Sequence, residues 1–124
     1  VEVQRLLKQA RSDINNAEKN IEIEAHDVAS FLCQQGVEKY LKAILLQTQG
    51  RHLYVHSLTE LGQELGVPAE IMHHLRFLSP DYTVARYPDA ANGVPCEVYD
   101  LKTAQEKLRA AREVEKWLKE QFLD

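Results

Sequence analysis

Several residue types that define specialised protein classes are scarce in this sequence. Its 124 residues include two cysteines, one methionine, one tryptophan, five glycines and four prolines. Cys33 and Cys96 lie far apart and lack metal-ligand spacing, so they form no disulfide framework. The absence of Gly- and Pro-rich stretches excludes collagen-like and disordered sequences. We therefore expect a globular protein of a reducing compartment, for which the cytoplasm is the simplest location.

Two further absences bear on membranes and nucleic acids. No apolar run approaches the ~20 residues of a membrane-spanning helix, and no basic-then-apolar signal segment opens the sequence. We therefore expect no membrane partner. The formal net charge is −4, from 15 basic and 19 acidic residues. This balance argues against binding of duplex DNA through a broad basic surface, but it leaves room for a local basic site.

Helix-forming residues are abundant. Leu, Ala, Glu, Gln, Lys and Arg predominate, and these side chains lose little conformational freedom in a helix. Apolar residues recur at helical spacing in several segments: 1–21, 25–49, 58–65, 68–79 and the stretch that follows Asp100. We predict an all-α fold, an antiparallel up-and-down bundle of four or five helices, with residues 1–124 forming a single domain.

Helix ends are marked by specific residues. Gly50 is expected to end the second helix, Ser57-Leu58-Thr59-Glu60 is a capping-box pattern, and Asp100 is expected to cap the last helix. Pro68 suits the first turn of a fourth helix, where its missing N–H is not needed. Residues 80–99 contain three prolines and are predicted to form a loop, which at this length is usually functional or mobile.

The second predicted helix is apolar over most of its circumference, so we expect this helix to lie in the middle of the fold. The rest of its surface is a polar stripe. At ~100° per residue the stripe spans about 140°. It consists of Gln34, Gln35, Glu38, Lys39 and Lys42. Buried charges cost several kcal/mol unless they are paired, so these side chains need partners in the chain, in a second subunit or in a ligand. A solvated strip with a Glu38–Lys42 ion pair is one interpretation, and a ligand or oligomer face is the other.

A second candidate site is the segment Arg86-Tyr87-Pro88-Asp89, which Tyr82 precedes. The arginine side chain is a fork of donors that matches a phosphate or a carboxylate, and the proline would fix the turn that presents it. The alternative is a surface arginine stacked on Tyr82 or Tyr87.

Motifs for metals, cofactors and familiar catalytic reactions are missing. His52 and His56 have a spacing of four, but they lie in a predicted connector and lack a third ligand. The sequence has no Ser-His-Asp order, Gly-rich phosphate loop or two-carboxylate signature. We therefore expect neither a metal site nor a cofactor.

Taken in order, these features resemble the HEPN domain, a family named for higher eukaryotes and prokaryotes, nucleotide-binding. The resemblance covers nearly the whole chain. The resemblance rests on these residues: Ala10, Asp13 and Ala17; Gln34-Gln35-x-x-Glu38-Lys39-x-x-Lys42-Ala43; His56-x-Leu58; and Tyr82-x-x-x-Arg86-Tyr87-Pro88. An Ala- and Leu-rich final helix completes the pattern.

The resemblance implies a helical bundle that pairs as a homodimer. Small prokaryotic members of the family often work beside a minimal nucleotidyltransferase (MNT), in pairs similar to toxin–antitoxin modules, and nucleotide binding is the proposed role of the HEPN half. The candidate binding residues that the resemblance implies are Gln35, Glu38, Lys39, Lys42, His56, Tyr82, Arg86 and Tyr87. The cations would bind phosphate, and Tyr82 or Tyr87 could stack on a base.

One departure from the family concerns catalysis. HEPN ribonucleases resemble one another in an arginine followed four to six residues later by a histidine, but no histidine follows Arg86 through Gly93. Metal-independent RNA cleavage needs a positioned base, usually histidine. We therefore expect a binding module without turnover. The alternatives are an RNA endonuclease that uses Arg86 or Arg51 with His56, and a dimeric helical scaffold without catalysis. Arg51 and His56 have the formal spacing but lie in a different connector.

Overall fold

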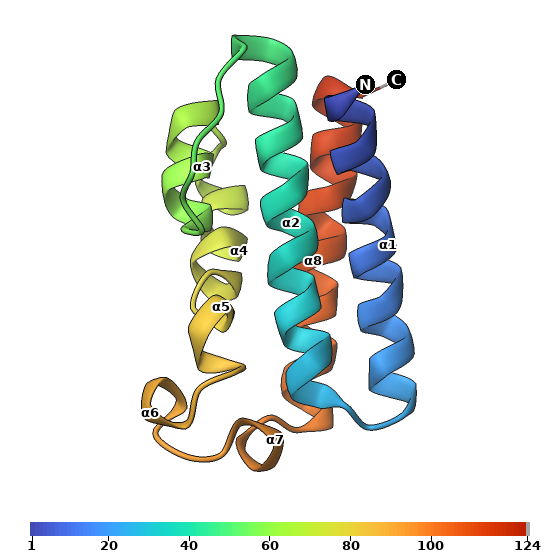
Figure 1. The fold of residues 1–124 in the computed structure, drawn as a ribbon, viewed down its shortest axis with the longest axis vertical. Coiled ribbons are helices and arrows are strands. Elements are labelled where there is room, and N and C mark those ends of the chain that lie inside the picture. The colour runs from blue at the N-terminus through green and yellow to red at the C-terminus, as the bar shows by residue number, and fades with distance from the viewer. Residues whose placement is uncertain (124) are drawn as a thin grey trace.

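The computed structural model describes residues 1–123, and within that range it is helical, without strands. Three long helices lie side by side (Figure 1): α1 (Glu2–Glu22), α2 (His26–Gln49) and α8 (Leu101–Phe122). Two shorter helices form a second layer: α3 (Leu58–Leu65) and α4 (Ala69–Leu78). Three single-turn helices follow at one end: α5 (Asp81–Val84), α6 (Pro88–Ala91) and α7 (Pro95–Val98). The predicted all-α bundle is confirmed.

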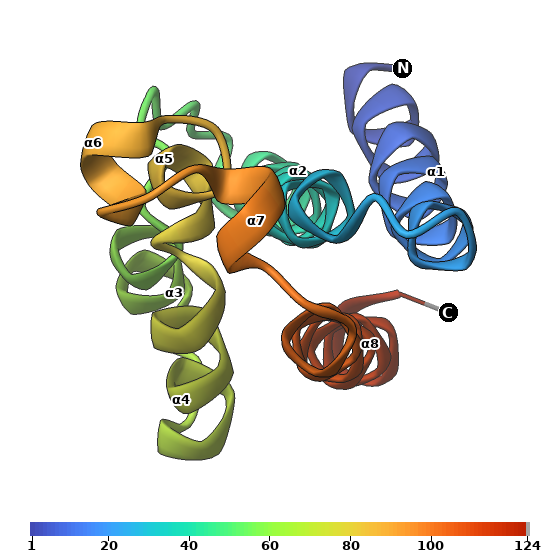
Figure 2. The same cartoon turned by 90° about the horizontal axis from the view of Figure 1, so that it is seen from below.

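α2 is the central helix, as its apolar circumference predicts. It packs against α1, α3 and α8 and contacts the short helices α5 and α7 (Figure 2). Its fully buried apolar side chains include Val37, Leu41, Ile44 and Leu45. α1 and α2 run antiparallel, and α1 begins at the same end of the bundle at which α8 finishes (Figure 1). No helix in the described part of the chain is long and apolar enough to cross a bilayer.

The helix ends predicted at Gly50, Ser57 and Asp100 are found in the structure, whereas Pro68 is the extended N-cap residue of α4 and not part of its first turn. Gly50 ends α2 in the left-handed conformation, with φ of 64°. The Ser57 hydroxyl accepts a hydrogen bond from the Glu60 backbone N–H at 3.3 Å, and the Asp100 carboxylate accepts one from the Thr103 N–H at 2.8 Å. These caps satisfy backbone donors that would otherwise lack partners in the first turn of a helix.

The segment 80–99, predicted as a loop, contains three short helices instead. Pro88 and Pro95 each open a helical turn, because a proline at the first helical position gives up no hydrogen bond. Asn92, with φ of 53°, ends α6 in the left-handed region that asparagine tolerates. Pro88 and Pro95 therefore start short helices, whereas the sequence analysis predicted a loop in which Pro88 fixes the turn that presents Arg86.

A buried ion pair fixes this segment to α8. The Lys107 Nζ lies 2.8 Å from Asp81 Oδ2 and donates to the Phe77 carbonyl at 2.6 Å, and the Tyr99 hydroxyl donates to the other Asp81 oxygen. Both charged side chains are less than a tenth exposed. The segment that carries Tyr82 and Arg86 is therefore anchored to the core at both ends.

Candidate functional site

The polar stripe of α2 forms a hydrogen-bonded chain that begins on α1. The Lys39 Nζ lies 2.7 Å from Asp13 Oδ2 and donates to Gln35 Oε1 at 3.3 Å. The Gln35 amide donates to Gln34 Oε1 at 2.8 Å, and the Gln34 amide donates to Glu38 Oε1 at 3.0 Å. These polar groups therefore satisfy one another within the chain, which is what their burial requires.

Glu38 connects the stripe to the connector that precedes α3. Its side chain, in a residue only 5% exposed, accepts from the Lys42 Nζ at 3.0 Å, so the predicted ion pair is present. Its Oε2 also lies 3.1 Å from the His56 Nδ1, and Gln34 donates to the His56 carbonyl at 3.1 Å. His56 is thus held through both its ring and its backbone.

The free nitrogen of His56 faces outward. Its side chain is 51% exposed, and no hydrogen bond within residues 1–123 involves Nε2. When Nδ1 carries the ring proton and donates to Glu38, Nε2 is an acceptor that can exchange a proton with a ligand.

Arg86 is enclosed by three aromatic rings. Its Cζ lies 4.5 Å from the ring centroid of Tyr82, 4.7 Å from that of Phe31 and 5.1 Å from that of Tyr87. The Nε donates to the Tyr82 carbonyl at 2.7 Å, whereas the two terminal nitrogens make no hydrogen bond with any described residue. The stacked arginine that the sequence allowed is therefore present, with its terminal donors still available.

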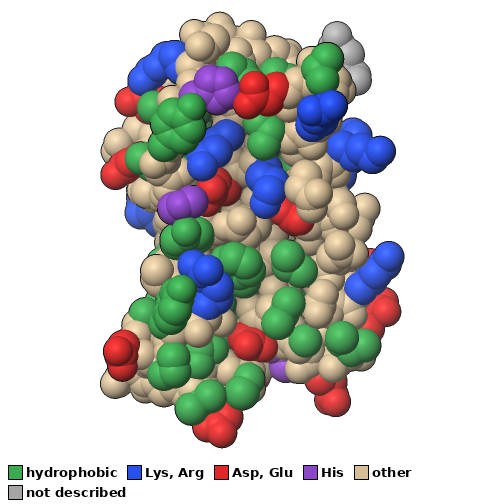
Figure 3. Space-filling model, viewed as in Figure 1, with side chains coloured by type: hydrophobic (Ala, Val, Ile, Leu, Met, Phe, Trp, Pro, Cys, Tyr) green, Lys and Arg blue, Asp and Glu red, His purple; other side chains and the backbone are tan. Residues whose placement is uncertain are grey.

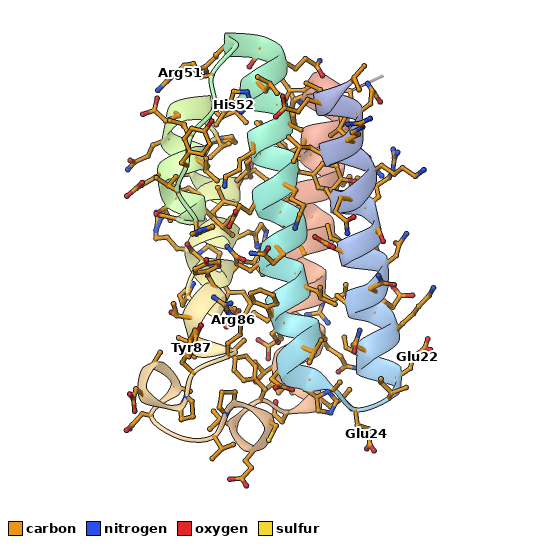
Figure 4. The ribbon with its side chains drawn as sticks, viewed as in Figure 1. Glu22, Glu24, Arg51, His52, Arg86 and Tyr87 are labelled. Carbon is orange, nitrogen blue, oxygen red and sulfur yellow. The ribbon has the colours of Figure 1, made fainter. Side chains whose placement is uncertain are left out.

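Tyr82 joins the two halves of the site. The His56 ring stacks on it with centroids 4.0 Å apart and an angle of 12° between the planes, while Arg86 contacts the same ring. We call the connected set the Arg86 patch; it consists of Glu38, Lys42, His56, Tyr82, Arg86 and Tyr87. Figure 4 shows Arg86 and Tyr87 on the face of the bundle that also presents α2.

Not all of the predicted site residues belong to this patch. Gln35 and Lys39 are directed toward α1 through Asp13. Arg51 lies near the opposite end of the same face (Figure 4), where its guanidinium donates to Gln49 and pairs with Glu64 at 2.8 Å. The structure therefore does not bring Arg51 and Arg86 together.

Sequence reasoning missed Phe31, the third ring around Arg86, because Phe31 belongs to the apolar surface of the second helix and carries no polar group that would single it out. Its register provides a signal: Phe31 precedes Glu38 by seven residues, which is close to two helical turns, so both lie on one face. The partner on that face comes from residues 80–99, and no local pattern predicts this contact.

Burial is the largest influence on the pKa values of Asp81 and Tyr99, the two groups that anchor the segment carrying Arg86. It raises the pKa of the Asp81 carboxyl, while the nearby Lys107 ammonium acts in the opposite direction. It also raises the pKa of Tyr99, whose hydroxyl donates to Asp81. Within residues 1–123 no group of three or more His, Cys, Asp or Glu side chains could hold a metal ion.

Solved structures share this fold. TT1696 from Thermus thermophilus is 27% identical with a TM-score of 0.88, over 95% of this chain and 96% of that chain. ST0689, an archaeal HEPN homologue, is 36% identical with a TM-score of 0.82, over 96% of each chain. An HEPN domain protein from Thermotoga maritima, 22% identical with a TM-score of 0.74 over 94% of this chain and 95% of that chain, supports the fold alone.

No curated protein matches the sequence. The family model of the HEPN domain, however, matches residues 3–121, which includes all of the Arg86 patch. With its helical bundle and its similarity to an archaeal HEPN homologue, the chain belongs to the HEPN domain family.

Proposed function

We propose that the Arg86 patch binds the phosphate group of a nucleotide, and that the chain acts as a dimeric, non-catalytic binding component beside a minimal nucleotidyltransferase in a toxin–antitoxin-like pair. The observation that carries the binding proposal is the Arg86 side chain, fixed by three rings and by Nε while its terminal nitrogens lack hydrogen-bond partners among the described residues.

The geometry of Arg86 suits an anion. Its guanidinium is held before a ligand arrives, so less conformational freedom is lost on binding. A phosphate can accept two parallel hydrogen bonds from the terminal nitrogens. The ammonium of Lys42 has three N–H donors, and Glu38 accepts from one of them. The other two donors of Lys42 also favour a negatively charged ligand. Tyr87, 53% exposed, has surface available for stacking on a base.

The surface around the patch supports a protein partner. Val28, Val94 and Val98 are each more than two fifths exposed. In Figure 3, hydrophobic side chains gather over the lower half of this face, whereas charged ones predominate above it. Apolar surface of this kind commonly marks contacts between proteins. Sedimentation of the full chain and co-purification with a co-expressed minimal nucleotidyltransferase test this part; a monomer that binds no such partner would contradict it.

Calorimetric titration with nucleoside monophosphates and triphosphates tests nucleotide binding. We expect binding that Arg86→Lys weakens about tenfold or more, because lysine keeps the charge but loses the two-pronged fork and the stacking. Arg51→Lys is the matched control, since Arg51 lies away from the patch and should leave binding unchanged. Absence of binding at millimolar concentration would overturn the proposal.

The Glu38–His56 contact favours a second candidate function, metal-independent RNA cleavage. A carboxylate at 3.1 Å orients the imidazole, which shares Tyr82 with a cationic arginine, and a base beside a phosphate-binding group is the arrangement this chemistry needs. Incubation with labelled RNA tests it. Cleavage that His56→Ala abolishes and His52→Ala leaves intact would support this candidate, and intact RNA with the wild-type chain would exclude it.

A further inference from the structure

A cleft of about 490 Å³ opens beside Arg86, between the first turns of α2 and the α6–α7 segment. Its walls are mostly apolar and include Val28, Phe31, Val94 and Pro95. A volume of this size falls within the range of small-molecule sites, which combine apolar walls with a few polar groups. Arg86 and Phe31 also belong to the aromatic enclosure described above, so the cleft is continuous with the Arg86 patch.

The cleft has one charged group of each sign. Arg86 supplies the positive charge and Asp27, in the first turn of α2, the negative one. Asp27 is partly buried, and its carboxylate makes no hydrogen bond or ion pair with any residue of the described range. An ionised carboxylate only accepts hydrogen bonds, so a ligand that fills this cleft should offer donors to Asp27 and an anionic group to Arg86.

We propose that this cleft binds the guanine base of a nucleotide whose phosphate is held by Arg86. A nucleobase has two flat apolar faces for the cleft walls and a polar edge. Guanine places two donors side by side, N1–H and the exocyclic N2 amino group, and these can bond both oxygens of one carboxylate. Adenine and cytosine offer only an exocyclic amino donor there, and uracil only a ring N–H. The inference rests on the proposed phosphate-binding role of Arg86.

Cys96 provides a direct probe because it is exposed and lines the same cleft. Cys33 is buried, and burial raises the pKa of its thiol to about 12, so an alkylating reagent at neutral pH should modify Cys96 alone. GMP should slow alkylation of Cys96 more than the same concentration of AMP does. Inorganic phosphate, which occupies only the Arg86 end, should leave the rate nearly unchanged.

Calorimetric titration of the full chain with GMP and AMP measures the preference. We expect GMP to bind roughly ten- to hundredfold more tightly, the effect of charge-assisted hydrogen bonds that only guanine makes in pairs. Asp27→Asn should remove most of this preference, because GMP loses two hydrogen bonds to the carboxylate and AMP at most one. Asp89→Asn is the matched control, since Asp89 lies in the first turn of α6 and outside the cleft lining.

The outcomes separate this inference from the function on which it depends. Equal binding of GMP and AMP that is sensitive to Arg86→Lys but not to Asp27→Asn would overturn the guanine assignment and leave phosphate binding intact. Absence of nucleotide binding would overturn both. The guanine base could belong to a free nucleotide or to an RNA strand. Oligoribonucleotides with a single guanosine or none distinguish these two sources. If GMP binds and the guanosine-containing strand binds more tightly than GMP does, the base is recognised as part of an RNA.

Discussion

Gln34 illustrates how a single residue organises the candidate site. It is fully buried, yet its amide donates to Glu38 and to the His56 carbonyl while its oxygen accepts from Gln35. The helical periodicity of the sequence predicts that Gln34 belongs to the polar arc. It does not predict that a carbonyl from a distant connector covers it, because that contact depends on how residues 51–56 return along α2.

Gln34→Met tests the value of this network at similar side-chain volume. The substitution removes three hydrogen bonds, and the buried Glu38 carboxylate and the His56 carbonyl each lose a donor. We expect the free energy of unfolding in urea to fall by about 1–3 kcal/mol. Gln63→Met, at an exposed position of α3, is the control and should have little effect. Equal stability of the two variants would mean that the network contributes nothing.

Close packing of α1 against α2 is the main feature at the scale of elements. A Cβ added at Gly36 would lie 2.5 Å from Ile14 Cγ1 and 3.1 Å from the Ala10 carbonyl oxygen. Glycine is therefore required by space at this position, although it is a poor helix former. The small residues of α1, Ala10 and Ala17, serve the same approach and are fully buried.

Gly36→Ala should destabilise the protein even though alanine favours the helix. Overpacking costs about 1–3 kcal/mol and here exceeds the gain in helix propensity. Thermal unfolding monitored by circular dichroism measures the change. The double variant with Ile14→Ala should be more stable than the sum of the two single effects implies, since the smaller residue makes room for the added methyl group. Strict additivity would contradict this account.

The anchor of residues 80–99 gives a second prediction at this scale. Lys107→Met removes the partner of a buried carboxylate and should cost about 3–5 kcal/mol. Burial then raises the Asp81 pKa with only the Tyr99 hydrogen bond acting against it, so the folded state keeps a proton that the unfolded chain releases near pH 4. Stability of this variant therefore falls as the pH rises above 4, and acidification from pH 7 should restore part of it.

The double variant Asp81→Asn, Lys107→Met controls for this effect. It has no charge at these two positions, so its stability should exceed that of Lys107→Met at pH 7, and the part of the pH dependence between pH 7 and 5 that Asp81 causes should be absent. A Lys107→Met protein whose stability declines on acidification would show that Asp81 is not the group responsible.

At the scale of the whole molecule, alkaline pH should unfold the protein cooperatively. Burial raises the pKa of Cys33 to about 12 and also raises those of Tyr40 and Tyr99, whose hydroxyls donate to Glu115 and Asp81. The unfolded chain loses these protons between about pH 8.5 and 10. Stability is therefore complete below that range and falls as the pH rises through it.

Urea denaturation at pH 8 and at pH 10.5 measures this loss. Tyr40→Phe removes one of the groups, so its stability should change less between the two pH values than that of the wild type, although it starts lower. Tyr54→Phe, at a highly exposed position, should keep the wild-type dependence. A pH dependence that is the same in all three proteins would exclude Tyr40 as a contributor.

The fold could be predicted from the sequence further than the site could. Apolar periodicity and capping residues such as Gly50 and Asp100 are local signals, and they locate the main helices. The site depends on contacts over long sequence separations. Tyr82 stacks on His56 and Arg86 lies over Phe31, and neither pairing leaves a trace in local spacing. The short helices of residues 80–99 were missed because their prolines start turns.

The position at which α1 begins and α8 finishes has a practical consequence. Both lie at one end of the bundle, whereas α6 and α7 lie at the other (Figure 1), and the α6–α7 segment contributes to the lining of the cleft beside Arg86. A biotin tag or a flexible linker attached at either terminus would extend away from the cleft. Protein immobilised on a biosensor chip through either tag should therefore keep the cleft open to the flowing solution, and both attachments should give the same ligand affinity.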